Sequence, residues 1–437
     1  MQQRKLSINN FKSLKALWKE VVMKISEDTL RKIILFCLGG LLLILPVAHT
    51  TSLRAFFFLS AVLIWLIRMG MTKEWKIFGT PLDIPLFLYL ITILISFFTS
   101  LNLRYSIHEF RGEFLTYTVI FYLTLNNLKS EEEIKRLVFM LLACSFFMSL
   151  YGMYDFFYVN KGNILDIDKF RFSSLHQGYE AYAQYLLIVL PFNILAIIYL
   201  RDSRWRAFFA AMLLLHAFAL FLTHTRGAWI AFWAEILMVS IFAIKKTAIK
   251  ISLIAGLIII SIFMINILPT SVIWHGEKAM ISTRDADLNE GFGKARLVMW
   301  KASFEEIIKN PFRGSGYGKT TFRWRFKDRV FAGSEQSHNT FVNTAIQLGI
   351  QGLIALLFII YVILIFQWRC FKKAKTNFQL LYFLSIMIMT IGFFIGNMFA
   401  EFYIDDTVQM FWLLIGLSVA LHRIQKKEEM IKKMTNA

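Results

Sequence analysis

The segment NFQLLYFLSIMIMTIGFFIGNMF, from Asn377 to Phe399, decides the fold class because it contains no charged residue. At about 1.5 Å of rise per residue, a helix of this length crosses a hydrocarbon core of about 30 Å. Its apolar residues are continuous and do not alternate with polar ones, which favours a membrane-spanning helix over a barrel strand. The segment therefore predicts an integral membrane protein built from helices.

Comparable apolar runs occur along the whole chain of 437 residues, of which 57% are hydrophobic and 16% aromatic. A soluble domain of this length has too little interior to bury so much apolar surface. We expect an all-α integral membrane protein with about twelve transmembrane helices, since an apolar run covers each of the residues 33–50, 53–69, 83–100, 113–127, 136–158, 182–200, 207–224, 227–244, 249–268, 340–367, 377–399 and 405–422.

The formal net charge of +19 would suggest nucleic acid as a partner if the protein were soluble. Most Lys and Arg residues instead flank the apolar runs, and the positive-inside rule assigns such residues in short loops to the cytoplasmic side. They are concentrated before Lys32, in short loops such as the one around Arg201, and in the tail from Arg423. We therefore expect a multi-pass protein of the cell inner (cytoplasmic) membrane, with cytoplasmic termini, lipid as a partner and no nucleic acid.

One connection is too long to be a turn, and it divides the chain. The expected parts are a basic cytoplasmic segment at 1–32, nine transmembrane helices at 33–268, a large periplasmic loop at 269–337, three more transmembrane helices at 338–422 and a basic cytoplasmic tail at 423–437. A long loop can be translocated despite its charge. Within it, the pattern predicts an amphipathic helix from Arg296 to about Lys309, ended by Asn310-Pro311.

The most specific motif is His338-Asn339, nine residues, then Gly349-Ile350-Gln351-Gly352. On one continuous helix, eleven residues make about three turns, which would place Gly349 beneath His338 and roughly 16 Å deeper. Small residues there would let another helix pack closely against Gly349 and Gly352. Histidine accepts a proton near neutral pH and suits a general base. A histidine that merely caps the helix is the alternative.

Two arginines are candidates for binding an anion. Thr225-Arg226-Gly227 stands at the predicted outer membrane boundary, and Arg296 opens the amphipathic helix of the long loop. The guanidinium fork suits the oxygens of a diphosphate. A snorkelling anchor at Arg226 and a solvated loop residue at Arg296 are the alternatives.

Four further residues are weaker candidates for substrate binding: Arg171, Asn339, Gly316 and Gly318. The glycines resemble part of a nucleotide-binding loop, but Arg313 occupies a position where that motif requires glycine, so a turn that shapes the site is the better interpretation. Arg171 either contacts a glycan or lies in a surface loop. No metal-ligand spacing is recognisable, and no cofactor is expected.

Together these motifs resemble the O-antigen ligases and the related Wzy-type polymerases. The resemblance covers the architecture of about twelve spans with one large late extracytoplasmic loop, which is GT-C-like and expected to contain short helices. It is most specific at His338, whose motif is similar to the ligase signature. Arg226 and Arg296 occupy positions similar to those of the two essential arginines of ligases.

The resemblance implies metal-independent transfer of a glycan from undecaprenyl diphosphate to a sugar hydroxyl of lipid A-core, with inversion, on the periplasmic face. His338 would activate the acceptor, while Arg226 and Arg296 would bind the diphosphate. A Wzy-type polymerase or an O-linked protein oligosaccharyltransferase is an alternative within the same superfamily. A polysaccharide flippase or transporter belongs to another class, and the repeated halves expected of many transporters are not evident here.

Overall fold

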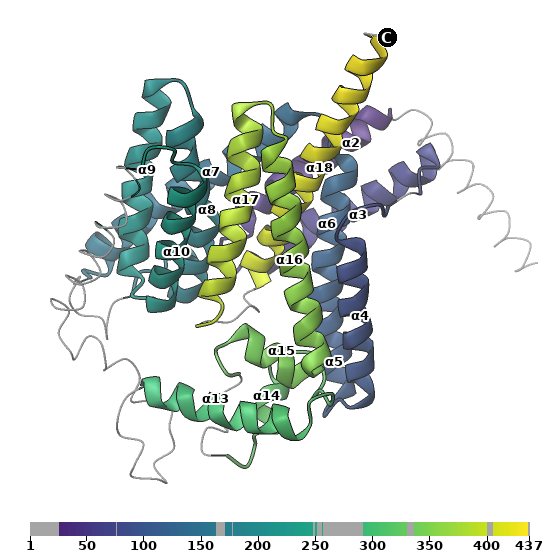
Figure 1. Ribbon diagram of the computed structural model, residues 1–437, viewed down its shortest axis with the longest axis vertical. Coiled ribbons are helices and arrows are strands. Elements are labelled where there is room, and N and C mark those ends of the chain that lie inside the picture. Colours follow the sequence, from purple (N-terminus) through teal and green to yellow (C-terminus); the bar gives the residue numbers. More distant parts are fainter. Residues whose placement is uncertain are drawn as a thin grey trace, which may run out of the picture.

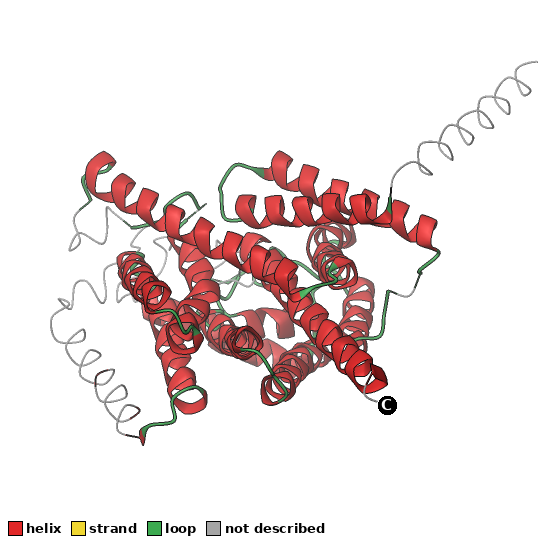
Figure 2. Ribbon diagram, turned by 90° about the horizontal axis from the view of Figure 1, so that it is seen from above, coloured by secondary structure: helices red, strands yellow, loops and turns green. Residues whose placement is uncertain are grey.

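The computed structural model describes residues 26–75, 77–162, 171–176, 178–247, 250, 256, 292–329, 336–399 and 405–435. All regular elements in these ranges are helical, as Figure 2 shows. The predicted span at 249–268, apart from residues 250 and 256, and the part of the long loop at 269–291 lie outside the described residues. The all-α class predicted from the sequence is therefore confirmed for the part of the chain that is described.

Figure 1 shows the order of the helices along the chain. The first half contains α2 (Glu27–Ile44), α3 (Thr51–Thr72), α4 (Asp83–Phe98), α5 (Leu103–Phe110), the π-helical turn η1 (Arg111–Leu115), α6 (Thr116–Asn127), α7 (Glu131–Tyr154), the π-helical turn η2 (Asp155–Val159), α8 (Tyr179–Tyr199), α9 (Ser203–Leu222) and α10 (Arg226–Phe242). The second half contains α13 (Phe292–Lys309), α14 (Thr321–Arg325), α15 (Thr340–Leu348), α16 (Ile350–Lys372), α17 (Asn377–Gly396) and α18 (Asp405–Thr435).

Seven described helices are long and apolar enough to cross a membrane, which supports a helical membrane protein. They lie at Thr51–Thr72, Glu131–Val159, Tyr179–Tyr199, Ser203–Leu222, Ile350–Lys372, Asn377–Gly396 and Thr407–Thr435. Helix α4 is apolar but shorter, and α2 carries Glu27, Asp28, Arg31 and Lys32 in its first turns. The count of twelve spans stays a prediction.

Helices α8 and α17 form the centre of the bundle. In their most apolar windows, 83% of the residues of α8 and 78% of those of α17 are buried inside the protein. The two helices pack against each other, and α10 packs against both. Tyr182, Phe192 and Tyr382 are among the largest fully buried side chains, and the rings of Phe192 and Tyr382 lie 5.7 Å apart. This core fixes the ends of α10 and α17, which carry the candidate site.

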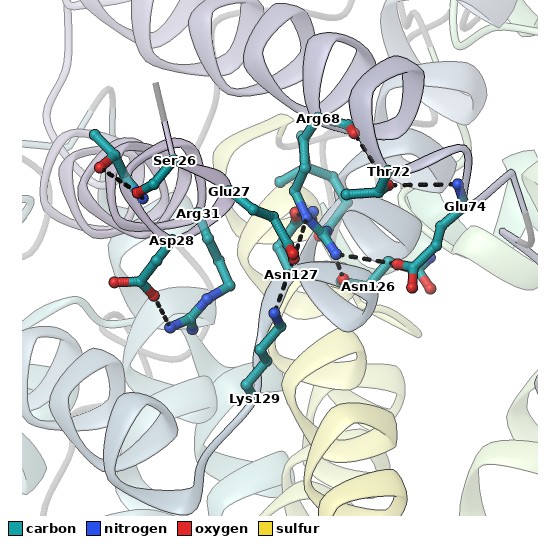
Figure 3. A network of polar contacts seen from close by, with 12 residues as sticks. Ser26, Glu27, Asp28, Arg31, Arg68, Thr72, Glu74, Asn126, Asn127 and Lys129 are labelled. Atoms are coloured by element: carbon teal, nitrogen blue, oxygen red, sulfur yellow. Dashed lines mark hydrogen bonds and ion pairs between the residues drawn. The ribbon is translucent and has the colours of Figure 1, made fainter. Parts of the chain in front are cut away.

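One end of the bundle is held by a network of charged and amide side chains (Figure 3). The guanidinium of Arg68 donates to Asn127 Oδ1 at 2.7 Å and to the backbone carbonyl oxygen of Asn126 at 3.1 Å. Glu27 lies 3.4 Å from Arg68 and 2.8 Å from Lys129. These contacts join the start of α2, the end of α3 and the α6–α7 connection, three segments that the charge pattern predicts to share one side.

The long C-terminal helix reaches the same end. Arg423 of α18 donates to Asn126 Oδ1 at 3.1 Å, and Lys375 pairs with Glu429 at 2.7 Å. Figure 1 places the end of α18 opposite α13, α14 and α15. The segments predicted to be cytoplasmic thus gather at one end of the bundle, whereas the side of the membrane that this end faces stays a prediction.

The prediction of one continuous helix at 340–367 is wrong. The segment forms two helices, because Gly349 adopts φ 78° and ψ 178°, a conformation outside the helical region that is essentially restricted to glycine. Helix α15 ends at Leu348, and α16 starts at Ile350, whose N–H donates to the Pro311 carbonyl oxygen at 2.8 Å. Gly349 is therefore a corner between two helices and does not lie beneath His338 on one helix face.

The amphipathic helix of the long loop ends where the sequence predicts. Helix α13 finishes at Lys309, directly before Asn310-Pro311, although it begins earlier than predicted, at Phe292. With α14 and α15 it forms a layer at one end of the bundle (Figure 1). Met299, Phe322 and Ile346, one from each helix, share a small apolar core in this layer. The layer brings the loop against the ends of the bundle helices.

Candidate functional site

Arg226 is the first residue of α10, directly after the tight connection from α9. Gly227, the residue after Arg226, has to be small. A Cβ added at Gly227 would clash with the Cβ of Phe399, in the turn that follows α17. Gly227 therefore lets the start of α10 approach this turn and places Arg226 beside it. The turn, Asn397–Phe399, is called the α17 turn below.

Arg296 reaches the α17 turn from the other direction. It lies in the first turns of α13, is half-buried and donates from Nη1 to the backbone carbonyl oxygen of Phe399 at 3.2 Å. Phe399 therefore contacts both the glycine that follows Arg226 and the guanidinium of Arg296. Two arginines separated by a long stretch of sequence come together through one residue of the α17 turn.

His338 precedes the first turn of α15 and does not cap it. The cap is Asn339, whose side-chain oxygen accepts from the backbone N–H groups of Phe341 and Val342 at 3.0 and 3.2 Å. His338 itself has φ 53°, a conformation that few residues other than glycine adopt. This arrangement separates the two roles, because Asn339 holds the helix end while the imidazole stays outside the helix.

The segment around His338 is braced by α13 and by the α17 turn. The indole N–H of Trp300 donates to the Ser337 carbonyl oxygen at 2.9 Å. The backbone N–H of Thr340 donates to the Asn397 carbonyl oxygen at 3.0 Å. Asn397 is fully buried, and its amide donates to the Phe393 carbonyl oxygen at 2.8 Å. The α17 turn therefore fixes the histidine segment as well as the two arginines.

The charges of these residues affect one another. Burial, and then the positive charge of Arg296, lowers the pKa of His338 to about 4. Burial lowers the pKa of Arg226, and the positive charges of Arg171 and Arg296 lower it further. Arg226 lies before the span predicted at 227–244, at the end of the bundle. Arg171 and Arg296 are thus each close enough to Arg226 to repel it, which makes the site attractive to an anion.

Arg171 is brought to this cluster by the segment that precedes α8. Its guanidinium lies over the ring of Tyr179, 4.4 Å from the centroid, in a cation–π contact. The next residue, Phe172, donates its N–H to the Leu222 carbonyl oxygen at the end of α9, at 3.2 Å. This bond ties Arg171 to the connection that leads into Arg226. Arg171 therefore lies near the site and not in a surface loop remote from it.

Part of the chain also matches a known protein family. Residues 209–357 match the family model described as O-antigen ligase (Wzy_C). Over this range the chain is similar to the O-antigen ligases. The resemblance predicted from the sequence is thereby confirmed, and with the described membrane-spanning helices it supports a glycosyltransferase-like membrane enzyme. No curated protein matches the chain.

The matched range contains Arg226, Arg296 and His338, whereas Arg171 and Phe399 lie outside it. The candidate site therefore extends beyond the matched range, into the segment before α8 and the α17 turn. Sequence reasoning missed the α17 turn because it acts largely through the backbone carbonyl groups of Asn397 and Phe399, which every residue type possesses. The only sequence signal nearby was Gly227, whose small size the structure explains by contact with Phe399.

Gly349 and Gly352 lie at the corner between α15 and α16. An added Cβ at Gly349 would meet the side chain of Gln351, 2.6 Å away, and one at Gly352 would clash with Leu348. The nearest atoms thus belong to the corner itself and not to a neighbouring bundle helix. The unbroken helix assumed in the sequence-based prediction is wrong, whereas close packing of another bundle helix at Gly349 and Gly352 stays a prediction.

Gly316 and Gly318 serve the packing of the loop. Both have positive φ, 102° and 115°. A Cβ at Gly316 would clash with Ser100, and one at Gly318 would come within 2.6 Å of Glu109. Their segment also accepts a hydrogen bond from the Leu101 N–H, through the Ser315 carbonyl oxygen at 3.0 Å. These glycines hold the loop against the connection between α4 and α5, and we leave them out of the proposed substrate contacts.

Proposed function

We propose that this chain is an inverting glycosyltransferase of the O-antigen ligase type, which moves a glycan from undecaprenyl diphosphate to a sugar hydroxyl of lipid A-core on the periplasmic face of the inner membrane. One observation carries the proposal. The α17 turn contacts or adjoins Arg226, Arg296 and the His338 segment, so an imidazole and several guanidinium groups meet at one end of the bundle. The family match independently favours lipid-linked and acceptor glycans as substrates.

In the proposed reaction, the neutral imidazole of His338 takes the proton of the acceptor hydroxyl. The hydroxyl oxygen attacks the anomeric carbon while the bond from that carbon to the diphosphate oxygen breaks on the opposite face, which inverts the configuration. The electron pair stays on undecaprenyl diphosphate, and the proton leaves from His338 to water. A lowered pKa keeps the imidazole neutral at pH 7, as a base must be.

Arg226 and Arg296 are proposed to bind the diphosphate and to stabilise the charge that develops as it leaves. Hydrogen bonds between guanidinium and phosphate groups are short and strong, and they gain further strength where water is excluded. Arg171 supplies additional positive charge beside Arg226. This arrangement stabilises the leaving group with side chains alone, so that the proposed transfer requires no metal ion.

The test is transfer in vitro with purified protein, undecaprenyl-diphosphate-linked glycan and lipid A-core, without nucleotide or divalent metal. Wild type is expected to shift lipid A-core to larger products on a gel, and His338→Ala is expected to abolish the shift while still inserting into membranes. His108→Ala is a matched control, because 73% of the His108 side chain is exposed. It is expected to behave as wild type.

The products also separate the alternatives. If only the lipid-linked glycan becomes longer, the enzyme is a polymerase, and if a protein acceptor is modified in place of lipid A-core, it is an O-linked protein oligosaccharyltransferase. Normal transfer by His338→Ala contradicts the role of the base. Absence of every transfer by wild type contradicts the proposed function and favours a flippase or transporter.

A further inference from the structure

A second histidine lies next to the arginines. His224 is in the connection between α9 and α10, two residues before Arg226, and its side chain is not part of the predicted His338 motif. Only 8% of the residue is exposed. Neither ring nitrogen has a hydrogen-bond partner among the residues that the structure describes. A buried polar group without a partner typically costs about 1–3 kcal/mol, so this imidazole requires an explanation.

The surroundings of His224 are aromatic on one side and cationic on the other. Its ring centroid lies 5.9 Å from that of Phe221 and 6.4 Å from that of Trp229. Arg171 is close enough for its positive charge to add to the effect of burial and lower the pKa of His224 to about 4. The imidazole is therefore neutral at pH 7, with one nitrogen that carries a proton.

The backbone holds His224 in this place at a further cost. Its φ is 53°, in the left-handed region that residues with a Cβ rarely adopt. Its N–H donates to the Phe221 carbonyl oxygen at 3.1 Å, and the neighbouring Leu222 carbonyl accepts from Phe172, the residue after Arg171. The same short connection thus positions His224, Arg171 and Arg226. Strain combined with an unsatisfied buried donor is typical of a binding site.

We propose that His224 is a ligand of the donor's diphosphate and donates its ring N–H to a phosphate oxygen beside Arg171 and Arg226. This inference rests on the proposed function, because only the proposed function makes the diphosphate of the donor the occupant of the site beside Arg171 and Arg226. The flanking guanidinium groups favour an anion over a neutral sugar hydroxyl. His224 needs no acidic partner, because the phosphate oxygen supplies the acceptor that the buried ring lacks. The acceptor hydroxyl is left to His338.

Kinetic comparison of three variants tests the role of the N–H. The amide of His224→Asn imitates a donor at Nδ1 and tolerates a positive φ, the amide of His224→Gln imitates a donor at Nε2, and His224→Phe keeps a ring without a donor. We expect His224→Phe to raise the KM for the lipid-linked donor about tenfold or more, as the loss of a hydrogen bond to a charged group does. One of the two amide variants is expected to stay within about threefold of wild type.

His176→Phe is the matched control. His176 is also buried, at 6% exposure, and both its ring nitrogens lack partners among the described residues. Its ring packs against Tyr182 and Tyr185, and the cation that affects its pKa is Arg54 in place of Arg171. The control is expected to leave the KM for the donor unchanged. An equal rise in KM for both phenylalanine variants would show a general effect of altered packing and overturn the inference.

A second measurement does not depend on a phenylalanine variant that folds. Protein labelled with ¹⁵N-histidine is titrated with farnesyl diphosphate, and farnesyl monophosphate is the comparison. We expect the ring signal that disappears in His224→Asn to shift with the diphosphate and to shift less with the monophosphate. If wild type binds the diphosphate and loses binding in Arg226→Ala while the His224 signal does not move, the inference fails and the proposed function stands. If wild type binds neither lipid, both fail.

Discussion

At the scale of single residues, the site depends on how Arg296 affects His338. A solvent-exposed histidine has a pKa of about 6.5 and would be partly protonated in a mildly acidic periplasm. Burial and the charge of Arg296 lower the pKa of His338 to about 4, so the base stays neutral over the physiological range. In the proposed reaction, the positive charge of Arg296 would therefore both attract the donor and keep His338 ready to accept a proton.

The first prediction follows from that pKa. Because a lowered pKa means that the imidazole is neutral above about pH 4, kcat/KM should be constant between pH 8 and pH 5 and fall as the pH drops through about 4. The value of kcat/KM is the appropriate measurement, since it reports ionisations of the free enzyme. An acid limb centred near pH 6.5 would show that His338 is not held in a buried cationic environment during the reaction.

The second prediction concerns the planar shape of the Arg226 guanidinium group. Arg226→Lys keeps the positive charge but loses the planar fork that binds two phosphate oxygens at once. We expect the KM for the lipid-linked donor to rise about tenfold, as the loss of one charge-assisted hydrogen bond implies. Arg323→Lys, at an exposed position of α14, is the control and should behave as wild type. A KM unchanged in Arg226→Lys would mean that charge alone suffices.

The residues that sequence reasoning identified are those to which the proposed reaction assigns the chemistry. His338, Arg226 and Arg296 were recognisable because imidazole and guanidinium groups are distinctive and occur in a known order. His224 had a weaker signal, a polar residue directly before Thr225-Arg226. The residues of the α17 turn had no signal of their own, because carbonyl oxygens are present at every position and only the fold determines which of them face a site.

At the scale of helices, Gly349 is the position where sequence and structure differ most. Hydropathy is continuous from 340 to 367, which made one helix the natural interpretation. The break is nevertheless encoded locally, since Gly349 has φ 78° and the Ile350 N–H is satisfied by Pro311 in place of a helical carbonyl. Periodicity cannot reveal such a corner, because both helices are apolar on their buried faces.

The third prediction tests this corner. Alanine at Gly349 would need a conformation that is essentially restricted to glycine, so Gly349→Ala should destabilise the protein by about 1–3 kcal/mol. We also expect transfer to decrease, because His338 directly precedes the Asn339 cap of α15. Thermal unfolding in detergent and the transfer assay measure the two effects. Gly70→Ala is the control. A Cβ there meets nothing within 4 Å, and alanine favours the helix. Equal stability of the two variants would contradict the corner.

At the scale of the whole molecule, the end opposite the site is held by buried charge. The fourth prediction is that Arg68→Met destabilises the protein by about 3 kcal/mol or more, because the buried side chain of Asn127 loses its guanidinium partner and Glu27 loses one of its cations. The measurement is the midpoint of thermal unfolding. Lys32→Met is the control, since 71% of the Lys32 side chain is exposed and its ion pair contributes little. A midpoint equal to that of the control would show that the network does not stabilise the fold.

The two ends of the molecule differ in a way that predicts its orientation. The end that carries the start of α2 and the end of α18 gathers the short basic loops, and the other end carries α13, α14 and the candidate site (Figure 1). The positive-inside rule counts charges in short loops and discounts long translocated ones. The basic residues of the loop between α10 and α15 therefore do not oppose a periplasmic site.

The fifth prediction is that a membrane-impermeant maleimide labels Lys327→Cys in intact spheroplasts, while Lys427→Cys is labelled only after permeabilisation. Both positions are exposed, and they lie at opposite ends of the molecule. A cysteine-free background removes the three native thiols, which include the half-buried Cys144. The reverse pattern would place His338 and the arginines in the cytoplasm, away from a periplasmic donor. It would overturn the proposed reaction even if the fold and the family are correct, because a site can use only the substrates that reach its side of the membrane.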